Sequence, residues 1–115
     1  MTVTADIGGG RIAGGHERCP AIDIHGINSY GGAPSLPQRY PESGGRKPYV
    51  ITEFGPPGAW ETQSTDWDAP YEMTSTDKAG FYRAGYEQGV PGAPGLAPGS
   101  YVLLWGHKMA ATGDR

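Results

Sequence analysis

The stretch YVITEFG at residues 49–55 decides the fold. Its apolar start runs into the acidic residue Glu53, and Gly55 ends the run, so it predicts a strand that presents a carboxylate at its C-terminal end. The stretch shows no clean alternation of apolar and polar residues. That pattern is typical of a strand in a parallel sheet that is covered on both faces.

Two further apolar runs, at residues 21–27 and 101–105, predict strands before and after this one. A helix is expected between the second and third strands, beginning near Thr76 after a Thr74-x-x-Asp77 capping pattern and ending near residues 88–89. A connection of that length favours parallel strands, because antiparallel neighbours need only a short hairpin. The expected apolar face of this helix consists of Ala79, Tyr82, Tyr86 and Val90.

The remaining segments give weaker signals. Residues 36–40 begin a helix that Pro41 interrupts, so only a short or kinked turn is expected there. Residues 1–20 are interpreted as a poorly ordered, glycine-rich N-terminal segment, since each glycine costs a helix roughly 1 kcal/mol against alanine. Residues 55–73 form a long loop directly after the central strand, and loops of this length are usually functional or disordered.

Composition narrows the class of partner. The chain has nine Lys and Arg against twelve Asp and Glu, which gives a net charge of −3, and these charges are scattered singly. The sequence therefore predicts neither a nucleic-acid partner nor a membrane partner. We expect a neutral partner. Cys19 is the single cysteine and excludes an internal disulfide, and no apolar run has the length of an export signal or a membrane span, which leaves the compartment open.

Three segments together resemble the sixth, seventh and eighth strands of family 2-like glycoside hydrolases. They are IDIHGINSYGG at 22–32, KPYVITEFGP at 47–56 and GSYVLLWG at 99–106, in the order and with the spacing of that family. The resemblance implies an α/β fold in which residues 21–115 form the C-terminal fragment of a glycosidase-type TIM barrel. About the last three strands of a (β/α)8 barrel would be present with their helices, because a complete barrel needs about 250 residues.

The resemblance also implies roles for residues at the strand ends. Glu53 matches the nucleophile of a retaining enzyme, and Tyr30 matches an aromatic residue whose phenol hydrogen-bonds that carboxylate. Asn28 matches a position that orients the loop or a sugar hydroxyl. Each residue also has a structural explanation: a solvated glutamate, a tyrosine packed between strand and helix, and an asparagine that stabilises a turn.

Tryptophans supply the expected saccharide contacts. Trp105 matches the residue that floors the sugar subsite, and a buried core tryptophan is the competing explanation. Trp60 and Trp67, on the loop after Glu53, are expected to rim a saccharide cleft, although either can simply anchor that loop.

The second carboxyl group of the expected chemistry is missing. In the resembled family the acid/base residue ends the fourth strand, and no part of this chain matches strands one to four. Glu61 is a carboxylate on the same loop as Glu53, but it matches no acid/base position. We therefore expect a fragment that acts on a β-linked saccharide only with the missing N-terminal half of the barrel, and that is inactive alone.

No metal site and no cofactor is predicted. His16-x-x-Cys19 has ligand-like residue types, but no second closely spaced pair completes a tetrahedral site. Two alternatives to the hydrolase stay open: a carbohydrate-binding or interaction module without chemistry, and a non-functional remnant. Three Trp and seven Tyr suit sugar stacking in a hydrolase and in a binding module alike, so composition does not separate these two.

Overall fold

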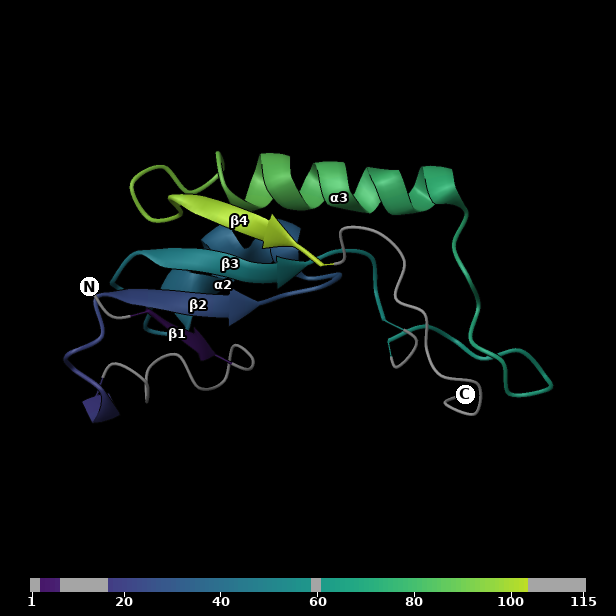
Figure 1. The fold of residues 1–115 in the computed structure, drawn as a ribbon, viewed down its shortest axis with the longest axis horizontal. Helices are drawn as coiled ribbons and strands as arrows, with labels where there is room; N and C mark the ends of the chain where they lie inside the picture. Colours follow the sequence, from purple (N-terminus) through teal and green to yellow (C-terminus); the bar gives the residue numbers. More distant parts are fainter. Residues whose placement is uncertain (1–2, 7–16, 59–60, 104–115) are drawn as a thin grey trace.

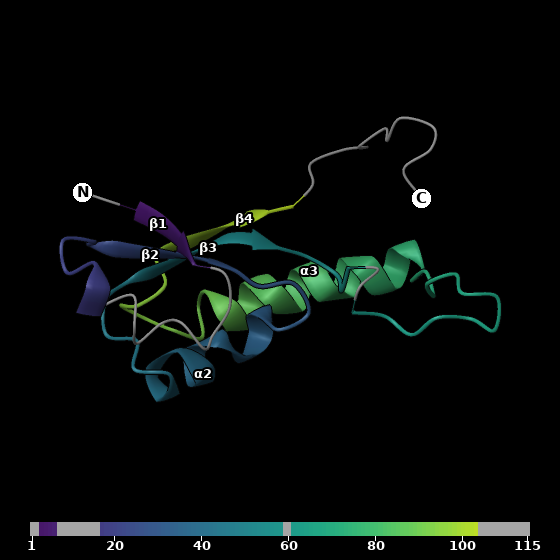
Figure 2. The same cartoon turned by 90° about the horizontal axis from the view of Figure 1, so that it is seen from below.

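A computed structural model describes residues 3–6, 17–58 and 61–103 of the chain. Four parallel strands form one sheet in the order β1-β2-β3-β4, and the helices lie on one side of it (Figures 1 and 2). The elements are β1 Val3–Asp6, β2 Ile24–Asn28, the 3-10 helix η2 Ala33–Ser35, α2 Leu36–Glu42, β3 Tyr49–Phe54, α3 Ser75–Gly89 and β4 Gly99–Val102.

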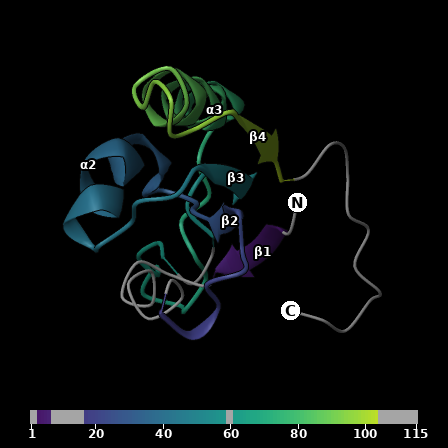
Figure 3. The ribbon, with the colours of Figure 1, turned by 90° about the vertical axis from the view of Figure 1, so that its left-hand side faces the viewer.

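The predicted partial (β/α)8 barrel is wrong. Seen along the strands, the sheet is an open row with β1 and β4 at its two edges (Figure 3). Closing a barrel of this kind takes about eight tilted strands, and four strands leave two edges unjoined. The expectation that both faces of the sheet are covered is also wrong for the described residues, because α2 and α3 lie on the same face.

The three expected strands are present and parallel, as the long connections predicted. Strand β1 was missed: it pairs with β2 from Val3↔Ile24 to Asp6↔Ile27, within the segment interpreted as poorly ordered. Its four residues are too few to show a period of two, so pairing with β2 defines this strand better than its own sequence does. Residues 7–16 of the same segment lie outside the described part of the chain.

The core lies between the sheet and the helices. Its largest fully buried side chains include Tyr40 of α2 and Tyr49 of β3, whose ring centroids are 4.6 Å apart. Both phenols are hydrogen-bonded, since Tyr40 donates to the carbonyl oxygen of Lys47 at 2.8 Å and Tyr49 donates to that of Gly89 at 3.1 Å. Buried phenols with partners avoid the desolvation penalty of an unsatisfied hydroxyl, so these two tyrosines fix where both helices meet the sheet.

The short helix α2 agrees with the sequence. Pro37 lies in its first turn, where a missing N–H costs nothing, and Pro41 lies near its end. The helix has seven residues and stops one residue after Pro41. The predicted short helical segment before the glycines at 44–45 is present, but Pro41 lies inside it and does not interrupt it.

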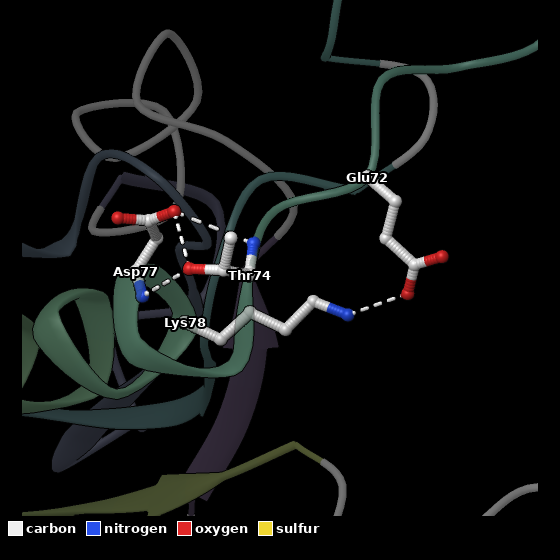
Figure 4. Close-up of polar contacts among 4 residues, drawn as sticks. All are labelled: Glu72, Thr74, Asp77 and Lys78. Atoms are coloured by element: carbon white, nitrogen blue, oxygen red, sulfur yellow. Dashed lines mark hydrogen bonds and ion pairs between the residues drawn. The ribbon is translucent and has the colours of Figure 1, made fainter.

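Helix α3 begins at the predicted capping pattern. The Thr74 hydroxyl accepts a hydrogen bond from the Asp77 amide at 3.2 Å, and the Asp77 carboxylate accepts one from the Thr74 amide at 3.3 Å (Figure 4). This reciprocal pair satisfies two amides at the helix start. No helix in the described ranges is long and apolar enough to cross a membrane.

The face that α3 presents to the sheet differs from the predicted one. Tyr82 and Val90 pack against the core as expected, but Tyr86 is 52% exposed. The buried positions of the helix are Gly85 and Gly89. The line of closest approach therefore passes through glycines, which a search for large apolar residues does not find.

Two glycines allow this close approach. A Cβ atom on Gly85 would lie 2.7 Å from Cδ2 of Phe54, and one on Gly89 would lie 2.9 Å from Cδ1 of Ile51 and 3.0 Å from the carbonyl oxygen of Ala33. From the sequence alone, glycines within a helix are expected to destabilise it. At these positions their lack of a side chain brings α3 against β3 and η2.

Gly80 and Gly85 form a matched pair for testing this packing. Nothing lies within 4 Å of a Cβ on Gly80, so Gly80→Ala should raise the free energy of unfolding by about 0.5–1 kcal/mol through helix propensity alone. Gly85→Ala gains the same propensity but pushes on the buried ring of Phe54, and overpacking costs about 1–3 kcal/mol. Urea unfolding followed by circular dichroism measures both variants. Equal stabilisation by the two substitutions would contradict the packing described.

Candidate functional site

The carboxyl ends of β2 and β3 bring the site together. The two strands pair in parallel from His25↔Tyr49 to Ile27↔Ile51, and the register then shifts so that Asn28 pairs with Glu53. The amide of Ser29 donates to the carbonyl oxygen of Glu53 at 2.8 Å, which extends the pairing by one residue. Residues just after β2 therefore lie beside the end of β3.

Tyr30 and Glu53 meet at this edge. The Tyr30 hydroxyl donates a hydrogen bond of 2.6 Å to Oε2 of Glu53, and both residues are partly buried. Burial, then the hydrogen bond to Glu53 and the charges of Glu53 and Glu61, raise the pKa of Tyr30 to about 12. The phenol therefore stays protonated at neutral pH and remains a donor to the carboxylate.

Asn28 makes a second link between the same two strands. The Thr52 hydroxyl donates to Oδ1 of Asn28 at 2.7 Å. Side chains alternate along a strand, and the neighbouring residues Ile27 and Ile51 are buried in the core under the helices. Asn28 and Thr52 thus belong to the opposite face, where their hydrogen bond ties the strand ends together.

Tyr82 of α3 supports the end of β3 from the helix side, and sequence reasoning assigned it only to the core. Its hydroxyl donates to the carbonyl oxygen of Leu103 at 2.8 Å, while the Leu103 amide donates to the carbonyl oxygen of Phe54 at 3.0 Å. A Cβ on Gly55 would lie 3.0 Å from the Leu103 carbonyl oxygen and 3.2 Å from Cε1 of Tyr82. Gly55 thus lets three elements converge next to Glu53.

The other predicted site residues are not brought to this pair by the described contacts. Trp60 and Trp105 lie outside the described residues. Trp67 is 77% exposed. Glu61 is exposed and its carboxylate accepts a hydrogen bond from the Gly58 amide at 3.1 Å, while its charge contributes to the raised pKa of Tyr30.

The loop after β3 contains a small hairpin over residues 63–71 that the sequence did not predict. Ser64 and Pro70 form an antiparallel bridge, the Tyr71 amide donates to the carbonyl oxygen of Gln63 at 2.9 Å, and the Thr65 hydroxyl accepts from the Ala69 amide at 3.1 Å. Asp68 has a φ of 62°, a backbone conformation that aspartate adopts more readily than most residues. The loop extends beyond the carboxyl ends of the strands toward the start of α3 (Figure 1).

The chemistry that this edge offers is that of a carboxylate held by a phenol. Within the described ranges, no group of three or more His, Cys, Asp or Glu residues could hold a metal ion. A partly buried carboxylate that accepts a hydrogen bond from a protonated phenol can act as a nucleophile or as a base. No protein-family model matches this chain, and no curated protein matches it.

The Tyr30 phenol gives a prediction for high pH. Because its folded pKa of about 12 exceeds the ordinary value of about 10, its contribution to stability is complete below about pH 10 and is lost as the pH rises through about 12. Glu53→Gln removes the charge and the anionic acceptor, so the pKa of Tyr30 should fall toward the ordinary value. Ultraviolet titration of the wild type and of Glu53→Gln measures this change. From each curve, the curve of the same protein carrying Tyr30→Phe is subtracted, so that only the Tyr30 signal remains. An unchanged Tyr30 titration in Glu53→Gln would show that the two groups do not interact.

Proposed function

We propose that this chain carries the nucleophile of a retaining glycoside hydrolase that acts on a β-linked saccharide. Glu53 is the nucleophile, and Tyr30 orients its carboxylate through a hydrogen bond. The observation that carries the proposal is the 2.6 Å hydrogen bond between these two side chains at the carboxyl edge of a parallel sheet. Its second support is the resemblance of the three strand motifs to family 2-like glycoside hydrolases.

The proposed step is attack of a Glu53 oxygen on the anomeric carbon. The glycosidic C–O bond breaks, its electron pair leaves with the aglycone oxygen, and a glycosyl ester forms on Glu53. A protonated Tyr30 stabilises the carboxylate before attack, because a neutral phenol donates a hydrogen bond to it without adding a second negative charge.

The acid that protonates an ordinary leaving group is proposed to come from outside this chain. In retaining enzymes the two carboxyl groups lie about 5–5.5 Å apart, and the matched motifs include only the nucleophile. The carboxylate of Glu61 is engaged with the Gly58 amide of its own loop. We therefore expect the chain alone to turn over ordinary saccharides very slowly or not at all.

A substrate that needs no acid isolates the proposed half-reaction. Dinitrophenolate leaves without protonation, and a fluorine beside the anomeric carbon slows hydrolysis of the ester, so dinitrophenyl β-fluoroglycosides should label Glu53. Intact-mass and peptide mass spectrometry detect the adduct. We expect labelling of the wild type by at least one fluoroglycoside of a small panel of common sugars, and release of one dinitrophenolate for each adduct.

Three variants make the labelling specific. Glu53→Gln should abolish the adduct, and Tyr30→Phe should slow its formation by about tenfold or more, because the carboxylate loses its fixed donor. Glu87→Gln is the matched control, since Glu87 lies on α3 and pairs with Arg83 at 3.0 Å. Labelling that persists in Glu53→Gln would contradict the proposal. So would the absence of labelling in a wild-type chain that has a native circular dichroism spectrum.

A saccharide-binding module without chemistry is the second candidate. The observation that favours it is the exposure of two aromatic side chains on the hairpin 63–71, Trp67 at 77% and Tyr71 at 60%. Exposed aromatic faces are suited to stacking on the apolar face of a sugar ring. Saccharide affinity without an adduct on Glu53 would favour this candidate over the hydrolase.

A further inference from the structure

A pocket of about 260 Å³ lies beyond the carboxyl end of β3 and is separate from the Tyr30 and Glu53 side chains. It is formed by the start of the loop after β3, the end of the hairpin 63–71 and the first turns of α3. Its volume is slightly below the roughly 300 Å³ at which ligand pockets usually begin, so it suits one small ring. None of the predicted site residues within the described ranges lines it.

The wall of the pocket is largely apolar. Pro56, Pro57 and Pro70 contribute rigid C–H surfaces, and Tyr71 adds an aromatic side chain that is 60% exposed. The hairpin hydrogen bond from the Tyr71 amide to Gln63 fixes the backbone of this aromatic residue. Three prolines and the hydrogen-bonded backbone of Tyr71 give this wall a largely preformed backbone, which lowers the entropy cost of binding.

The polar side of the pocket carries one charge of each sign. Nζ of Lys78 lies 2.7 Å from Oε1 of Glu72, and both residues line the pocket. Figure 4 draws this ion pair. The hydrogen bond to Lys78 lowers the pKa of Glu72, which favours its carboxylate form at neutral pH. A paired ammonium and carboxylate add no net charge and provide donors and acceptors together, which favours a neutral, hydroxyl-rich ligand over an ion.

The pocket is joined to the site at the strand ends. Pro57 follows Glu53 by four residues, and a Cβ on Gly31 would lie 3.2 Å from Cγ of Pro57. Gly31 is the neighbour of Tyr30. The same proline thus forms a wall of the pocket and contacts the loop that carries the Tyr30 phenol.

We propose that this pocket binds one ring of a neutral saccharide, with the ring stacked on Tyr71 and its hydroxyls hydrogen-bonded to Lys78 and Glu72. The inference rests on the proposed function in one respect: the ring belongs to the same β-linked saccharide whose neighbouring residue reaches Glu53. The substrate class is then an oligosaccharide of at least two neutral sugars. A single charged sugar would not match a pocket whose ion pair carries no net charge.

The test measures binding of a neutral monosaccharide and of its β-linked di- and tetrasaccharides to the folded chain by NMR titration. The wild type should show saturable shifts at Tyr71 and Lys78, with the tetrasaccharide bound more tightly than the monosaccharide. Tyr71→Ala should weaken tetrasaccharide affinity by about tenfold, the size of one lost aromatic stack. Tyr86→Ala is the matched control, because Tyr86 is an exposed tyrosine of α3 that does not line the pocket.

The outcomes separate this inference from the proposed function. Two results overturn the pocket inference and leave the hydrolase proposal standing. In one, Tyr71→Ala binds the tetrasaccharide as tightly as the wild type does. In the other, the wild type is labelled at Glu53 but binds no saccharide. If saccharide affinity depends on Tyr71 but Glu53 is never labelled, saccharide binding at the pocket is supported and the hydrolase proposal is overturned. Equal losses in Tyr71→Ala and Tyr86→Ala would also overturn the pocket, since the effect would not be local.

Discussion

The parallel pairing of β2 with β3 is the constraint on which the site depends. Its register places Asn28 opposite Glu53, so that the chain leaving β2 passes directly beside the end of β3. Parallel strands end at the same edge of a sheet, and that geometry lets a tyrosine 23 residues away in sequence reach the Glu53 carboxylate. A shift of one residue in this register would move Asn28 and Tyr30 away from Glu53 together.

Helix α3 holds this edge in place from one side of the sheet. Gly85 and Gly89 bring its axis close to β3, and Tyr82 then reaches the carbonyl oxygen of Leu103 at the end of β4. The arrangement needs neither a closed barrel nor a cover on the other face. An open sheet with a firmly packed carboxyl edge is sufficient to position the Tyr30 phenol against Glu53.

Local signals in the sequence predicted individual strands and the start of α3, but they did not predict the architecture of the sheet. The run at 49–55 and the capping pair Thr74 and Asp77 were readable because each depends on neighbouring residues. The parallel direction of the strands was readable from the length of the connection between them. The partial (β/α)8 barrel was wrong because strand motifs do not state whether neighbouring strands belong to a barrel or to an open sheet. The close approach at Gly85 and the hairpin 63–71 depend on contacts between distant or irregular segments. The meeting of Tyr30 with Glu53 was anticipated only through the family resemblance of the strand motifs.

A double-mutant cycle between Tyr30 and Glu53 tests most directly the hydrogen bond from which the functional account begins. The free energies of unfolding of the wild type, Tyr30→Phe, Glu53→Gln and the double variant are measured at neutral pH by denaturant titration. A hydrogen bond to a charged acceptor at a partly buried site should give a coupling energy of roughly 1 kcal/mol or more. Effects that simply add, within about 0.3 kcal/mol, would mean that the phenol does not hold the carboxylate, and would contradict the account.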